Sequence, residues 1–271
     1  MDAQWIITAF VLIDTVLERL EHRSHKLALV PDSEIVLVAV VAAKYFQNHH
    51  ERALCVLREA RYLSGRIDLT RFNRRLHALR DWLAFLATTL GELFLGGDVF
   101  VIDSIPVPVC RRVRAWRCRK VRGREYCGYC AAKKEKFFGW RLHLICTPGG
   151  VPVSFCMVPA AFHDLTPVHE LAFALPPKAR LFGDKAYNSA DDEASMLTDT
   201  GVRLVPIRKA NMAPHEWFVD DLELREYRHT IETVNSQLEK MGIERLYART
   251  NQGFELKVHA SLIALACTNF D

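Results

Sequence analysis

The feature that most constrains the fold is a change in the spacing of apolar residues at Gly96 and Gly97. Before this pair, apolar residues recur at three- and four-residue intervals with a few turn residues between the runs. That spacing predicts an all-helical N-terminal domain over residues 1–95. After the pair, short β-branched runs replace the helical pattern, so a second domain built on a sheet is predicted over residues 96–271.

The second domain is predicted to combine strands and helices. Strands are predicted at residues 99–105, 137–146, 151–158, 179–182 and 202–206. Helices are predicted from residue 165 and over residues 190–197, 221–241 and 253–266. Three strands followed by alternating helices and strands indicate an α/β fold, with a mixed sheet flanked by helices.

An aspartate interrupts the first of these apolar runs. Asp103 stands where the pattern of a buried strand favours an apolar residue. A buried carboxylate costs several kcal/mol unless it is paired or coordinated. Two interpretations follow: a carboxylate that binds a cation, or one that backbone N–H groups satisfy at the end of a strand.

Two further carboxylates lie at positions where a ligand could bind. Asp184 ends another apolar run, at a predicted strand-to-helix turn, and open sheets place ligands at the carboxyl ends of strands. A carboxylate there can instead cap a helix, but Ser189 lies closer to the next helix and fills that role better. Glu232 lies on the helix predicted at residues 221–241, where a solvated glutamate is the commoner case.

Taken together, the three carboxylates form a set of oxygen ligands. They suit a pair of Mg²⁺ or Mn²⁺ ions, which prefer oxygen and keep waters that phosphate oxygens can displace. Helix geometry argues against Glu239 as the third ligand but does not by itself exclude Glu226. The choice of Glu232 therefore rests also on its basic neighbours Arg225 and Arg228 and on resemblance to a known family. At about 100° per residue Glu226 points away from the polar strip that holds Glu232, and Glu239 lies about 10 Å further along the axis.

Positive charge is concentrated in a cysteine-containing insertion at about residues 106–136, although the net charge of the chain is only +4. The basic residues that we expect to contact a polyanion there are Arg111, Arg112, Arg114, Arg117, Arg119, Lys120 and Arg122. A helix predicted at residues 69–80 adds Arg71, Arg74 and Arg75 on one face. Both stretches suit contact with phosphates, and a solvated surface is the alternative for each.

Eight irregularly spaced cysteines predict reduced thiols in a cytoplasm. Cys127 and Cys130 form a lone CxxC, but Cys110 and Cys118 upstream are spaced too widely for the usual second pair of zinc ligands, which argues against zinc. The longest apolar run, residues 35–43, is too short to cross a bilayer, so no contact with a membrane is expected.

Several short blocks, in order, resemble those of DDE-type transposases from bacterial insertion sequences. The blocks are residues 100–104, 138–144, 163–164, 183–187 and 228–232, preceded by residues 71–76. The resemblance implies a ribonuclease-H-like core that carries Asp103, Asp184 and Glu232 as its catalytic, metal-binding residues. It also places four further residues near the site: His143, His163, Asp164 and Tyr187. Of these, His143 is interpreted as a structural residue.

The resemblance has one departure. A related signature has tyrosine three residues before the arginine and lysine seven after the glutamate, where this chain has Arg225 and Glu239. Tyr227 and Lys240 are their near neighbours, so the flanking roles are left open.

The function that the resemblance implies is that of a transposase. It would bind the terminal inverted repeats of its element, cut the DNA there and join the freed 3′-hydroxyls to double-stranded target DNA. Lys185, Arg225 and Arg228 would neutralise phosphates, and a homodimer or larger synaptic assembly in the bacterial cytoplasm, at the nucleoid, would hold both ends. The alternatives are a nuclease that cuts without joining and a DNA-binding relative without catalysis; the presence of all three carboxylates argues against the latter.

Overall fold

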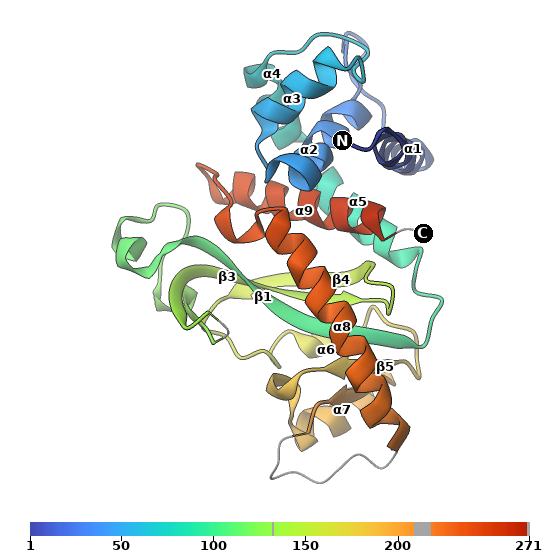
Figure 1. Ribbon diagram of the computed structural model, residues 1–271, viewed down its shortest axis with the longest axis vertical. Helices are drawn as coiled ribbons and strands as arrows, with labels where there is room; N and C mark the ends of the chain where they lie inside the picture. The colour runs from blue at the N-terminus through green and yellow to red at the C-terminus, as the bar shows by residue number, and fades with distance from the viewer. Residues whose placement is uncertain (132, 209–217, 270–271) are drawn as a thin grey trace. The chain divides into compact units, whose positions relative to one another are not determined.

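The computed structural model describes residues 1–131, 133–208 and 218–269, and the chain forms two compact units (Figure 1). Unit 1 combines Met1–Leu90 with Gln237–Asp271, and unit 2 is Gly91–Ser236. This division differs from the predicted boundary at residue 95, because the end of the chain clusters with the N-terminal helices. The reason lies in α9 (Asn251–Thr268), which is largely apolar and contacts α1, α2 and α4.

Unit 1 is helical, as predicted. Its other helices are α1 (Ala3–Arg19), α2 (Asp32–Phe46), α3 (His50–Glu59), α4 (Leu69–Ala78) and most of α5 (Arg80–Glu92), with a 3-10 turn η4 (Ile243–Arg245). Every residue of α2 from Ser33 to Ala43 is buried, which is typical of a helix surrounded by others. The basic helix predicted at residues 69–80 is shorter, since α4 ends at Ala78. None of the helices in the described ranges is both long and apolar enough to span a membrane.

Unit 2 is built on a mixed sheet. Its strands are β1 (Val99–Arg111), β2 (Cys127–Cys130), β3 (Glu135–Cys146), β4 (Pro152–Pro159), β5 (Arg180–Gly183) and β6 (Arg203–Pro206). The order is β2-β3-β1-β5-β6, and β4 also pairs with β3. The strand β1 runs antiparallel to β3 and parallel to β5, and β6 is parallel to β5. The predicted hairpin of residues 137–158 is the β3–β4 pair.

The first strand is longer than predicted. It continues past Ile105 to Arg111 and stays paired with β3, with one irregularity after Pro108. Prolines are tolerated in a strand where their missing N–H faces an unpaired edge, and β5 covers the other edge of β1 only from Val99 to Val101. The insertion is therefore narrower than residues 106–136. It contains the 3-10 turns η1 (Arg112–Arg117) and η2 (Arg124–Tyr126), and the strand β2.

Helices cover both faces of the sheet. Alternate residues of β1 point to opposite faces, so Phe100 and Ile102 enter the core formed with α6 (Val168–Ala172) and α7 (Ala190–Thr200). Val101 and Asp103 instead face the helix α8 (Phe218–Lys240), which Figure 1 shows crossing the strands. The predicted fold class, a ribonuclease-H-like α/β fold with a mixed sheet flanked by helices, is confirmed.

Candidate active site

Sheet register brings Asp103 and Asp184 to neighbouring positions. Val101 of β1 is the partner of Phe182 in β5, and continuing this parallel register by two residues reaches Asp103 and Asp184. Adjacent strands lie about 4.8 Å apart. Gly183, the last residue of β5 and the one before Asp184, has no room for a side chain, since a Cβ there would lie 2.9 Å from the Tyr187 ring and 3.2 Å from the Ile102 side chain.

Asp103 carries a poorly compensated negative charge. Burial is the main cause that raises its pKa to about 6, and the nearby charges of Asp184 and Asp164 act in the same direction. Hydrogen bonds from the Ser104 backbone and the Asn235 side chain oppose this shift in part. The donation from Asn235 Nδ2 to Asp103 Oδ2 measures 2.6 Å. These hydrogen bonds offset only part of the cost of burying the charge, and a bound cation would offset more of it, which favours the interpretation as a cation ligand.

One face of α8 closes a cavity of about 520 Å³ over these aspartates. Its residues that line the cavity recur at helical spacing: Leu224, Tyr227, Arg228, Ile231, Glu232 and Asn235. Asp103, Asp184 and Lys185 line the same cavity from the sheet side. Glu226 and Arg225 are exposed and are not among the lining residues. The geometry thus groups Glu232 with the two aspartates and separates Glu226 from them.

Three interactions within unit 2 hold α8 in this position. Arg180 of β5 forms a two-pronged ion pair with Glu223. The rings of Phe182 and Tyr227 lie 5.2 Å apart between centroids. Further along the helix, Thr230 Oγ1 donates to the carbonyl oxygen of Pro148 at 2.9 Å. The direction of α8, and with it the position of Glu232, is set by contacts on both sides of the cavity.

The carboxylates already have polar partners. Glu232 accepts from Arg228 Nε at 3.0 Å, and Asp184 Oδ1 accepts from the Ala186 amide at 2.8 Å. Ser189, as predicted, caps α7. Within the ranges that the structure describes, no three His, Cys, Asp or Glu side chains converge closely enough to hold a metal ion. To bind a cation, Glu232 has to exchange its ion pair with Arg228.

A polar network adjoins Asp103 on the other face of β1. Ser104 Oγ donates to Asp164 Oδ1 at 2.9 Å, and Arg141 lies 3.3 Å from both of these oxygens. His143 Nε2 is 3.8 Å from Asp164, and burial lowers the pKa of this histidine to about 4, so the ring is neutral at pH 7. Burial also raises the pKa of Tyr187 well above its usual value. The nearby charges of Asp164, Asp103 and Asp184 act in the same direction on Tyr187, so Asp164 lies near both His143 and Tyr187.

His163 differs from these predicted neighbours. Its side chain is exposed, and its Nδ1 accepts from the Leu165 amide at 3.3 Å, which stabilises the turn after β4. The structure therefore gives His163 a local structural contact.

Most of the basic residues expected to contact DNA are exposed. The exposed set is Arg71, Arg74, Arg111, Arg112, Arg114, Arg117, Arg119, Arg122, Lys185, Arg225 and Arg228, and Lys120 is partly exposed. Arg75 is different, because its guanidinium binds the Val30 carbonyl and forms an ion pair with Asp32. That side chain is engaged within unit 1.

Asn235 is a candidate site residue that the sequence-based predictions do not include. It follows Glu232 by three residues on the same helix strip, so helical spacing gave a usable signal. Its partner Asp103 is 132 positions away in the chain, and that contact is visible only in the fold.

Comparison with known families bears on residues 96–249. This stretch, more than half of the chain, matches the family model described as a transposase DDE domain. No curated protein and no solved structure matches the chain.

Proposed function

The chain belongs to the DDE transposases, and from that premise we propose that it cuts DNA at the ends of an insertion sequence and joins the freed 3′-hydroxyls to target DNA. The observation that supports this proposal is that Asp103, Asp184 and Glu232 all line one cavity. Transposases of this type act on DNA and use divalent metal ions. The function therefore rests on what these three side chains can bind.

The donor chemistry fits Mg²⁺ or Mn²⁺. All three side chains offer carboxylate oxygens, and burial, together with the nearby Asp184 and Asp164, raises the pKa of Asp103, a cost that a bound cation would reduce. Asp103 and Asp184 would hold the ions and Glu232 would complete the site. Bound divalent ions, two in the proposed site, activate the attacking oxygen and stabilise the leaving oxygen at phosphorus.

The protein's own side chains position the reactants. Asn235 holds the Asp103 carboxylate toward the cavity through its 2.6 Å hydrogen bond. Lys185 and Arg228 line the cavity and supply positive charge for the phosphate of the DNA strand. No side chain has to attack the DNA, because water and the 3′-hydroxyl are the nucleophiles.

Recognition of the element is assigned to other surfaces. Exposed Arg71 and Arg74 of α4 would contact the terminal inverted repeats, and the arginines of the β1–β2 connection would contact backbone phosphates near the site. Two ends must be cut together, so we propose a homodimer or a larger assembly on DNA in the bacterial cytoplasm, at the nucleoid.

The test is incubation of the purified protein with Mg²⁺, DNA carrying the element's ends and a target plasmid. Joined product supports the proposal. Nicks without joining would indicate a nuclease, and a shifted band without cleavage would indicate a DNA-binding relative. Asp103→Ala and Asp184→Ala are expected to lose cleavage while they retain DNA binding, because phosphate contacts are made by other residues. Cleavage by either variant would refute the assigned site.

A matched series tests the third carboxylate. Glu232→Gln is expected to abolish strand transfer, whereas Glu226→Gln and Glu239→Gln are expected to leave it near normal. Glu226 does not line the cavity, and Glu239 lies outside unit 2. If Glu232→Gln stays active while Glu226→Gln or Glu239→Gln is inactive, the choice of Glu232 as the third metal ligand is wrong.

A further inference from the structure

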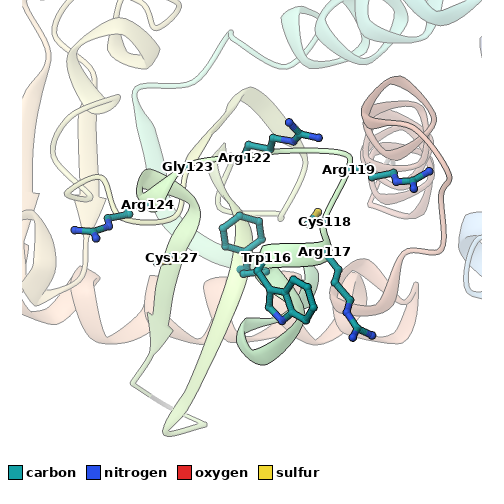
Figure 2. Close-up of a pocket in the computed structure, with 10 residues that line it drawn as sticks. Trp116, Arg117, Cys118, Arg119, Arg122, Gly123, Arg124 and Cys127 are labelled. Carbon is teal, nitrogen blue, oxygen red and sulfur yellow. The ribbon is translucent and has the colours of Figure 1, made fainter.

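The connection between β1 and β2 folds back to form a second pocket, separate from the carboxylate cavity. It has a volume of about 680 Å³ and lies over the face of the sheet that carries Phe138 and Cys127. Figure 2 shows Trp116 and Arg117 projecting side by side, with Arg119 and Arg122 farther along the same connection. None of the described residues that line the pocket is acidic.

The pocket combines an exposed aromatic ring with several arginines. The Trp116 side chain is 76 % exposed, although a large apolar ring is normally buried. The Arg117 guanidinium lies over this ring, 4.3 Å from its centroid, so positive charge is held directly against the aromatic face. Arg119, Arg122 and Arg124 add positive charge around the pocket.

This chemistry matches a nucleotide with an unpaired base. Aromatic side chains bind bases by stacking whatever the sequence, while the cations beside them bind the strand's phosphates. A base inside a duplex has its faces covered by its neighbours, and exposing one costs least where the strand is already unpaired. Pockets of this volume are in the range that holds small organic molecules.

We propose that this pocket binds an unpaired nucleotide of the DNA, with the base on Trp116 and the phosphates on Arg117, Arg119 and Arg122. The proposal rests on the proposed function, because it takes the DNA substrate as given. Cys110, beside Phe138 in the sheet, is seven residues along β1 from Asp103, a span of about 23 Å at roughly 3.3 Å per residue. A stacked strand of this length holds about seven nucleotides at roughly 3.4 Å each, and an extended, unpaired strand holds fewer.

Binding of tailed and blunt DNA by the full chain in EDTA tests the proposal without cleavage. The probes are one duplex with a ten-nucleotide single-stranded tail and the same duplex with blunt ends, compared by fluorescence anisotropy. We expect the wild-type protein to bind the tailed DNA about 5- to 100-fold more tightly, the range for stacking of one base. Trp116→Ala should lose this preference without weaker binding to the blunt duplex, and Trp116→Phe should keep part of it.

The matched control is Phe173→Ala, which removes another exposed aromatic side chain of unit 2 outside the pocket. It should behave like the wild type. In tailed DNA with 2-aminopurine at successive positions of the tail, stacking on Trp116 should quench the fluorescence most at one position, and this quenching should be absent in Trp116→Ala.

The possible failures are distinct. Equal wild-type affinity for tailed and blunt DNA would refute the nucleotide pocket and leave the proposed function standing. An equal loss for both DNAs in Trp116→Ala would make Trp116 a duplex contact and would also refute it. Absence of binding to either DNA would refute the proposed function itself.

Discussion

Replacing Asp103 by asparagine is expected to stabilise the metal-free protein and to abolish DNA cleavage. Asparagine keeps the shape of the side chain, and its carbonyl oxygen can accept the hydrogen bond from Asn235, but it has no charge to desolvate. A rise in pKa from 3.8 to about 6 corresponds to about 3 kcal/mol, at roughly 1.4 kcal/mol per pH unit. Since the carboxylate is partly open to the cavity, we expect a gain of about 1–3 kcal/mol.

The sign of the pH dependence follows from the raised pKa. Below pH 3.8, Asp103 is protonated in both the folded and the unfolded protein, and its charge has no effect. Between 3.8 and about 6 the unfolded chain ionises first, so the folded protein loses stability as the pH rises. The loss is complete above pH 6. The advantage of Asp103→Asn should therefore be small at pH 4 and full at pH 8.

Urea unfolding in EDTA, from pH 4 to pH 8, measures this difference. Asp199→Asn changes an exposed aspartate of the same unit and should alter the free energy of unfolding by less than about 0.5 kcal/mol at either pH. Equal stability of Asp103→Asn and the wild type at pH 8, or a difference that grows toward pH 4, would contradict the reasoning. Added Mg²⁺ should raise the stability of the wild type more than that of the variant.

Three further predictions concern other parts of the chain. Glu223→Gln removes the ion pair with Arg180 that ties α8 to β5, so unfolding in urea should show a loss of about 1–3 kcal/mol, and the cleavage rate should fall more than DNA affinity; an unchanged cleavage rate would contradict this. Burial lowers the pKa of His50 to about 3, so the wild type should lose about 2 kcal/mol between pH 7 and pH 5 that His50→Gln does not lose; parallel stability profiles would exclude this effect. Cys127 and Cys130 are three residues apart on β2, so their side chains point to opposite faces of the sheet. Serine variants of either cysteine should therefore cleave DNA normally. Zinc that is present in the purified wild-type protein and lost in Cys127→Ser would overturn the prediction that the chain binds no zinc.

Local patterns predicted most of the helices and strands and singled out the candidate carboxylates. Asp103 was recognisable because a charged residue interrupts an apolar run, and Asp184 because it follows another run at a turn. Ser189 was identified as the cap of α7 from its place just before the helix. These signals depend on neighbours in the sequence, so they need no knowledge of the fold.

The remaining features depend on distant contacts. Pro106 and Pro108 normally end a strand, and only the sheet order reveals that the neighbouring edge of β1 is open beyond Val101. Arg75 shares the pattern of its exposed neighbours, and its pairing with Asp32 requires the fold of unit 1. The pocket at Trp116 likewise depends on how the β1–β2 connection folds back over β3.

Along the chain, unit 2 lies between the two segments of unit 1, and this order has a consequence for synthesis on the ribosome. Residues 91–236 can emerge and fold while the helices of unit 1 still lack α9. The 35 residues from 237 to 271 take roughly 2–7 s to make at about 5–20 residues per second. During that interval α2, whose residues from Ser33 to Ala43 are all buried in the finished protein, has an incomplete apolar environment. The apolar residues of α2 are therefore exposed to aggregation and to chaperone binding until α9 has been made.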